Sequence, residues 1–120
     1  MAAQIETDPA FFAALSAKET ETKSGYGTSY AFRHKHNLFG ASKKEVPIRY
    51  RSYQKSADSW LRMFGGDVWG APSMDDFIDG LQSVGRYQRP YNSKDKSYFD
   101  GLAKKYDDVK RWAGICGVDL

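Results

Sequence analysis

The 120-residue chain has few of the residues from which metal and cofactor sites are usually built. Cys116 is its single cysteine, so an internal disulfide and a cysteine-based metal site are both excluded. His34 and His36 stand two positions apart without a third ligand nearby, which is more typical of surface or loop histidines than of a zinc site. The acidic residues form no cluster of the calcium or magnesium type. We therefore expect no metal ion and no cofactor.

Long apolar runs and the common nucleotide and nucleophile motifs are also missing. No stretch approaches the roughly 18 apolar residues of a membrane span, and the first eight residues lack the apolar run of a signal peptide. The segment Gly25-Tyr26-Gly27 lacks the third glycine and the preceding strand of a phosphate-binding loop. There is no nucleophile elbow. If the protein is an enzyme, carboxylate chemistry is what remains.

Length and composition fit one globular domain spanning residues 1–120, with residues 1–7 and 115–120 expected as loose tails. Aromatic residues make up 15% of the chain, and eight of them are tyrosines, which suit both surfaces and sugar-binding grooves. The net charge is only +3, and lysines and arginines are mixed with acids. Without a recognition motif we expect no nucleic-acid partner, whereas a mildly basic surface would favour an anionic polymer such as a bacterial wall.

Hydrophobic periodicity and capping residues predict a mainly α-helical fold with at most a short β-hairpin arm. A helix is expected from Pro9 to Thr22, because Asp8 is a good N-cap and proline suits the first helical position. The later predictions are a helical turn over 30–35, a hairpin or extended link over 41–53, a helix starting at 56–59 and ended by Gly65-Gly66, a helix from Ser73 to Gly85, and a helix over 94–113.

Glu19 continues the apolar stripe of the first predicted helix. It follows Leu15 by four residues and Phe12 by seven, whereas Glu21 is turned about 240° from Leu15 and faces solvent. A carboxylate on an apolar face loses water, which raises its pKa. A raised pKa is what a general acid needs at neutral pH. The alternative interpretation is a salt-bridged glutamate at the end of a core helix.

Three short segments follow one another around Glu19: Ala17-Lys18-Glu19-Thr20, Gly25-Tyr26-Gly27-Thr28-Ser29 and His36-Asn37-Leu38-Phe39-Gly40. In this order they resemble the bacterial glucosaminidase family of peptidoglycan hydrolases, the flagellar and autolysin types of the lysozyme-like superfamily. Four inserted residues leave Glu21-Thr22 as a second possible match, and the arm after Gly40 is short. The resemblance continues to Trp112 with smaller matches, which are Tyr50-Arg51-Ser52-Tyr53, Ser56-Ala57-Asp58-Ser59-Trp60 and Leu81-Gln82-Ser83-Val84-Gly85-Arg86-Tyr87.

The resemblance implies a lysozyme-like domain that cleaves a β-1,4 bond of the peptidoglycan glycan strand, on the GlcNAc side, with Glu19 as the general acid. It makes Glu45 the candidate second acid, although the 2-acetamido group of the sugar could assist instead. The implied remaining site residues are Tyr87, which would orient water or sugar, Asn37 and Phe39 at the sugar amide, and Tyr26, Trp69 and Tyr91 on sugar faces.

Two enzymatic alternatives share this scaffold, a muramidase and a lytic transglycosylase, and the latter would need no second acid. A non-catalytic glycan-binding or virion structural module is the alternative from another class. The absence of a signal peptide fits a phage-encoded or virion-associated protein, or a domain of a secreted protein, that acts at the bacterial cell wall.

Overall fold

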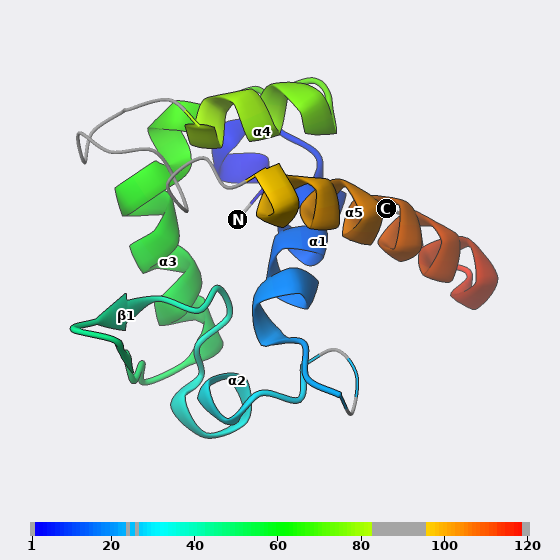
Figure 1. Cartoon of the computed structure of the whole chain (residues 1–120). Coiled ribbons are helices and arrows are strands. Elements are labelled where there is room, and N and C mark those ends of the chain that lie inside the picture. The colour runs from blue at the N-terminus through cyan, green and yellow to red at the C-terminus, as the bar shows by residue number, and fades with distance from the viewer. Residues whose placement is uncertain (1, 24, 26, 83–95, 119–120) are drawn as a thin grey trace.

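The computed structural model describes residues 2–23, 25, 27–82 and 96–118 (Figure 1). Within these residues the fold is mainly α-helical with one short hairpin, as the sequence predicts. The elements are η1 (Ala2–Ile5), α1 (Pro9–Thr20), α2 (Tyr30–Lys35), β1 (Ser42–Lys43), β2 (Val46–Pro47), α3 (Tyr53–Phe64), η2 (Gly65–Val68), α4 (Met74–Gln82) and α5 (Lys96–Cys116), where η marks a 3₁₀-helix.

Helix α1 begins as predicted and ends two residues early. The Asp8 carboxylate accepts a hydrogen bond from the Ala10 backbone N–H at 2.9 Å, and Pro9 occupies the first turn. Glu21 is already extended, and the backbone of Thr22 pairs with that of Gly25 in an isolated antiparallel bridge. The glycine turn therefore takes the chain out of the helix directly after Thr20.

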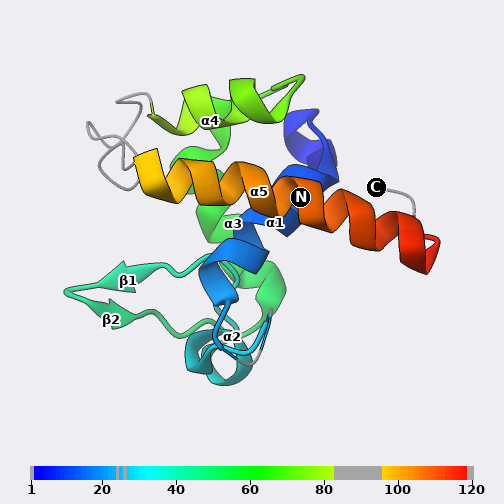
Figure 2. The same ribbon diagram turned by 45° about the vertical axis from the view of Figure 1, so that its right-hand side comes forward.

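The core forms where α1 crosses α5, and this is the largest contact between two elements (Figures 1 and 2). Phe11 and Leu15 of α1 are fully buried, as is Leu102 of α5. Aromatic rings extend this core toward α3 and α4. Phe12 meets Trp60 edge-on at 5.3 Å between ring centroids, and Phe11 lies 5.3 Å from Phe77. Helix α1 is thus packed on several sides, which fixes the position of its last turn.

Two further helix boundaries differ from the sequence-based expectation. Helix α3 starts at Tyr53, because the Ser52 hydroxyl caps it by accepting a hydrogen bond from Lys55 N at 3.2 Å. It ends at Phe64 as predicted, and Gly65, its C-cap, keeps right-handed helical geometry and leads into η2. Helix α5 continues to Cys116, so the first two residues of the expected loose tail are helical.

The N-terminal residues are also built into the fold instead of forming a loose tail. Ile5 is buried in the core, and its carbonyl accepts a hydrogen bond from Gly70 N at 2.7 Å. The Thr7 hydroxyl donates to the Ala71 carbonyl at 2.7 Å. These contacts join η1 to the segment that follows η2.

The segment between α2 and α3 contains a β-hairpin. Of the two predictions for residues 41–53, a hairpin or an extended link, the hairpin is therefore the one that the structure shows. Strands β1 and β2 pair antiparallel, with Lys43 opposite Val46. Lys44 and Glu45 form the turn, and both have positive φ (51° and 67°). This is the backbone geometry of a type I′ hairpin turn, although the sequence lacks the Asn-Gly pair that usually marks it.

Gly80 provides a test of the packing of α4 on η2. A Cβ added there would lie 2.3 Å from the Asp67 carbonyl oxygen, so one of the two backbones would have to move. We expect Gly80→Ala to lower the free energy of unfolding by about 2 kcal/mol or more. The matched control is Gly114→Ala in α5, where the added Cβ meets open space; there alanine should raise the stability by up to about 1 kcal/mol. Urea denaturation followed by circular dichroism measures both, and equal stabilities would contradict this packing.

Candidate active site

Glu19 lies in the last turn of α1 and is only partly exposed. Loss of hydration on burial raises the pKa of its carboxyl group above the ordinary value. Two neighbours oppose this rise in pKa, the hydrogen bond from Tyr98 and the positive charge of Lys18. Since burial outweighs both, the carboxyl group is set to hold its proton at a higher pH than an exposed glutamate does.

The Glu19 carboxylate is held between two distant segments of the chain. The Tyr98 hydroxyl, in the first turn of α5, donates a short hydrogen bond to Glu19 Oε1. On the other side, a Cβ added to Gly40 would lie 2.6 Å from Glu19 Oε2, so only a glycine leaves room for the carboxylate in this position. Gly40 also has a φ of +70°, which side chains disfavour. One oxygen thus faces α5 and the other faces the loop that leads into the hairpin.

Lys18 and Gly101 also lie near Tyr98. The Lys18 ammonium lies 5.5 Å from the centroid of the Tyr98 ring, within the range of a cation–π contact. A Cβ added to Gly101, one turn further along α5, would come within 3.0 Å of Lys18 Cε. The absence of a side chain at Gly101 therefore allows Lys18 to lie along α5 beside the tyrosine.

Thr20 fastens the glycine turn to the end of α1. Its side chain is buried, and its hydroxyl donates to the Ser16 carbonyl at 2.6 Å and accepts from Gly27 N at 3.1 Å. Its carbonyl accepts hydrogen bonds from the backbone N–H groups of Thr28 and Ser29, both at 3.1 Å. The neighbours Glu19 and Thr20 thus have different roles. The Glu19 carboxylate lies between Tyr98 and Gly40, and the Thr20 side chain anchors the glycine turn.

Asn37 and Phe39 shape the loop that carries Gly40. The buried Asn37 amide donates to the carbonyls of Ala41 (2.8 Å) and Ile48 (3.0 Å) and accepts from Ala41 N (3.1 Å). Phe39 is buried against Trp60. Both side chains hold the loop beside Glu19 from the inside, and the sugar contact predicted for them stays a prediction.

The same loop is tied to both neighbouring helices through its central residue. The Leu38 carbonyl accepts a hydrogen bond from the Ser16 hydroxyl of α1 at 2.9 Å, and Leu38 N donates to the Ser56 hydroxyl of α3 at 3.0 Å. Gly40 is therefore held at a defined distance from the end of α1.

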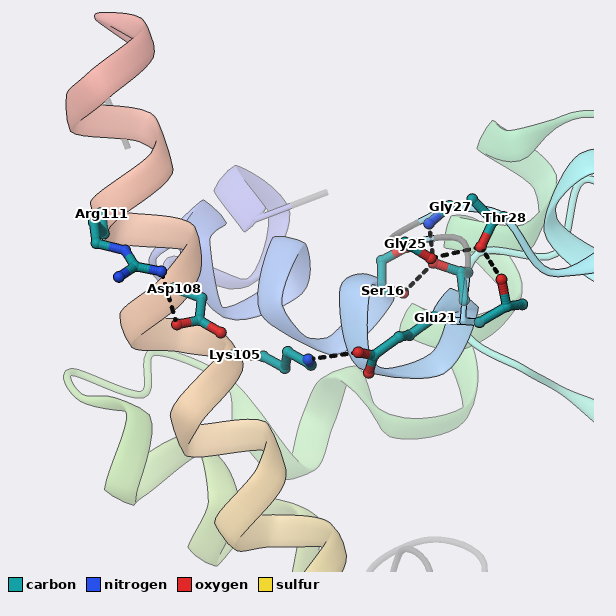
Figure 3. Close-up of polar contacts among 10 residues, drawn as sticks. Ser16, Glu21, Gly25, Gly27, Thr28, Lys105, Asp108 and Arg111 are labelled. Carbon is teal, nitrogen blue, oxygen red and sulfur yellow. Dashed lines mark hydrogen bonds and ion pairs between the residues drawn. The ribbon is translucent and has the colours of Figure 1, made fainter.

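Glu21 points elsewhere. It is exposed, and its carboxylate forms an ion pair with Lys105 of α5 at 2.9 Å (Figure 3). The helix-face reasoning from the sequence therefore agrees with the structure on geometry, since Glu19 is the desolvated carboxylate and Glu21 is the solvated one. The catalytic role of Glu19 stays a prediction.

Of the remaining predicted site residues, the structure describes Glu45 and Trp69. Glu45 is exposed in the hairpin turn, and Trp69 is 57% exposed after η2. Tyr26, Tyr87 and Tyr91 lie outside the described residues. In the described part of the chain, the charged or hydrogen-bonding groups that act on the pKa of Glu19 are Tyr98 and Lys18, neither of which is a carboxylate.

Sequence reasoning did not select Tyr98 or Lys18 as site residues. The sequence places Tyr98 directly before the core residue Phe99, and near the position of a tyrosine in the glucosaminidase family that the chain resembles. Neither signal indicates what its hydroxyl contacts. The contact with Glu19 spans 79 positions and depends on how α1 crosses α5.

The described residues provide neither a metal-binding cluster nor a helix suited to crossing a membrane. No group of three or more histidine, cysteine, aspartate or glutamate side chains is arranged to hold a metal ion. None of the helices in this part has both the length and the apolar character needed to cross a membrane.

Comparisons of the chain with known protein families, with curated protein sequences and with solved structures found no match.

Burial of the Glu19 charge predicts a stability that depends on pH. Because its pKa is higher in the folded protein than in the unfolded chain, the folded state holds more protons between those two values, and stability falls as pH rises through that window. Glu19→Gln keeps an oxygen for the Tyr98 hydroxyl and removes the charge. We expect this variant to be more stable than the wild type at neutral pH, with the advantage disappearing below the pKa of an unperturbed glutamate.

Urea denaturation at a series of pH values measures this difference. The control is Glu21→Gln, which breaks the ion pair with Lys105 and should lower the stability by less than about 1 kcal/mol. A Glu19→Gln variant that is less stable than the wild type at neutral pH would contradict the desolvated position of this carboxylate.

Proposed function

We propose that the protein hydrolyses the β-1,4-linked glycan strand of peptidoglycan, as an endo-β-N-acetylglucosaminidase, with Glu19 as the general acid. The observation that carries this proposal is the Glu19 carboxyl group itself, partly buried, raised in pKa and held between Tyr98 and Gly40. Protonation of the leaving oxygen is the step that a glycosidase assigns to such a group.

The electrostatics of Glu19 fit this role. A general acid must hold its proton at the working pH and release it when the glycosidic oxygen gains negative charge. Burial favours the first property, because it raises the pKa of the carboxyl group. The Tyr98 hydroxyl and the Lys18 ammonium supply the second, because both stabilise the carboxylate that is left after the proton has been transferred.

Three of the segments that resemble the glucosaminidase family meet at the last turn of α1, which supports the proposal. The glycine turn is bound to the end of α1 through Thr20, and Ser29 then caps α2 by accepting from Phe32 N at 3.1 Å. The Asn37–Gly40 loop places a glycine against the Glu19 carboxylate.

The second group in the reaction is the open part of the mechanism. Glu45 is the acid that the resemblance provides, and its place in the hairpin turn would let it approach a bound strand only from the solvent side. A substrate 2-acetamido group that attacks its own anomeric carbon would need no second protein carboxylate.

A lytic transglycosylase is the second candidate activity. It is favoured by one observation, that no carboxylate of the described residues acts on the pKa of Glu19. In such a reaction the 6-hydroxyl of the sugar replaces water, and the product carries a 1,6-anhydro end. A muramidase would instead leave a reducing MurNAc end, and the proposed glucosaminidase leaves a reducing GlcNAc end.

The deciding experiment is digestion of purified peptidoglycan, followed by mass spectrometry of the fragments. We expect the wild type to release fragments with reducing GlcNAc ends, and Glu19→Gln to lower the rate by at least about 100-fold, the usual contribution of a general acid. Glu21→Gln is the matched control, since it changes the same residue type two positions away at the exposed ion pair with Lys105.

Three results would count against the proposal. Loss of activity in Glu21→Gln but not in Glu19→Gln would move the acid to the other glutamate. Anhydro or reducing MurNAc ends would replace the glucosaminidase with one of the two other enzymes. A wild-type protein that binds peptidoglycan but releases no fragments would favour the alternative of a non-catalytic glycan-binding or virion structural module over an enzyme. As the proposed enzyme, the protein would act at the bacterial wall, encoded by a phage or carried within a secreted or virion assembly.

A further inference from the structure

Positive charge is concentrated in one short part of the chain. Residues 30–55 contain seven of the 18 lysines and arginines and one of the 15 acids, Glu45, which gives this segment a net charge of +6. The other 94 residues contain 11 basic and 14 acidic residues and carry a net charge of −3. The overall charge of +3 therefore hides a strongly uneven distribution. The basic patch consists of Arg33, Lys35, Lys43, Lys44, Arg49, Arg51 and Lys55.

Hydrogen bonds bring the basic patch together at one end of the molecule. Lys35 Nζ donates to the Pro47 carbonyl at 3.1 Å, and Arg49 donates to the His34 carbonyl at 2.7 Å, so β2 and the segment after it are fastened to α2. The Tyr53 hydroxyl donates to the Phe32 carbonyl at 3.0 Å and ties in the start of α3. Figures 1 and 2 show α2, the hairpin and the first turn of α3 gathered at the same end.

The charges of this patch are not neutralised from within. All of its members are exposed except the half-buried Lys35, and in the part of the chain that the structure describes none of the seven forms an ion pair. Charges of one sign gathered on one surface repel one another unless a counter-charge binds to them. A partner with regularly repeated negative charge would supply it.

We propose that the basic patch binds the phosphodiester-linked anionic polymer of the bacterial wall, of the teichoic-acid type. This inference rests on the proposed function, because it is the glycan strand at Glu19 that makes a wall-attached polymer the expected polyanion. Gly40, which touches the Glu19 carboxylate, is directly followed by the hairpin that carries Lys43 and Lys44. A polymer attached to the glycan strand would therefore reach the patch from the site.

Nucleic acid fits this surface less well. Single-stranded nucleic acid binds by stacking bases on free aromatic faces, but the two exposed rings of this region already contact their neighbours. Tyr30 lies 4.6 Å from the His34 ring, and Tyr53 lies between Phe32 at 5.0 Å and His36 at 4.9 Å. What the surface offers is charge, which a polyol-phosphate chain can use without stacking.

The test is binding of the protein to cell walls in two forms, one native and one stripped of phosphodiester polymer by hydrofluoric acid. We combine Lys43→Gln, Lys44→Gln, Arg51→Gln and Lys55→Gln, four changes that avoid the two patch residues hydrogen-bonded to backbone carbonyls. The matched control combines Lys23→Gln, Lys96→Gln, Lys104→Gln and Lys110→Gln, which removes the same number of charges from exposed positions outside the patch. Circular dichroism verifies that both variants are folded.

We expect the wild type to bind native walls at least about tenfold more tightly than stripped walls, with a strong decrease at high salt. The patch variant should lose this preference, and the control variant should keep it. Equal binding of wild type and patch variant to native walls would overturn the proposal. Equal losses in both variants would also overturn it, because net charge and not the patch would then decide binding.

Two further arms separate this proposal from its alternatives. In competition at equal phosphate concentration, single-stranded DNA that displaces the protein from purified polymer more effectively than the polymer itself would overturn the proposal in favour of a nucleic acid. A protein that binds the polymer through the patch and yet releases no glycan fragments would refute the proposed hydrolase while supporting the patch.

Discussion

The desolvation of one carboxylate, that of Glu19, is the constraint on which the site depends. Three parts of the molecule meet at this group: the last turn of α1, the first turn of α5 and the loop that ends at Gly40. Burying the charge costs free energy, which the packing of α1 against α5 must supply. Because the fold keeps this carboxylate in spite of the cost, Glu19 is a candidate functional group, since functional sites commonly trade stability for activity.

The short motifs around this carboxylate make sense as parts of one support. The Thr20 hydroxyl anchors the glycine turn to the end of α1, and the Asn37 amide forms hydrogen bonds with the backbone of Ala41 across the following loop. Gly40 then leaves the space that the carboxylate needs. Each residue type is the one its place demands: a hydroxyl that can donate and accept, an amide with both functions, and a residue without a side chain. The same loop leads into the basic patch, so the acid and the charged surface are connected through a few residues.

Much of the helical framework and the inward position of Glu19 could be predicted from sequence, because both follow from local periodicity. Asp8 caps α1, and the spacing from Leu15 turns Glu19 inward and Glu21 outward. Contacts across the fold could not be predicted. The partner of Glu19, Tyr98, is 79 residues away. The hairpin turn at Lys44 and Glu45 lacks its usual sequence signal. The basic residues of 30–55 look scattered in the sequence, and it is the hydrogen bonds from the Lys35 and Arg49 side chains to distant carbonyls that bring them together.

The central claim is that Glu19 has a raised pKa set by burial and moderated by Tyr98. NMR titration of the glutamate side-chain carboxyl carbons tests it directly, in the wild type and in Tyr98→Phe, with Glu19→Gln to assign the resonance. We predict a Glu19 pKa above the ordinary glutamate value of about 4.3, and a still higher pKa in Tyr98→Phe, because the lost hydrogen bond stabilised the charged form. A Glu19 that titrates at or below the ordinary value would contradict the account.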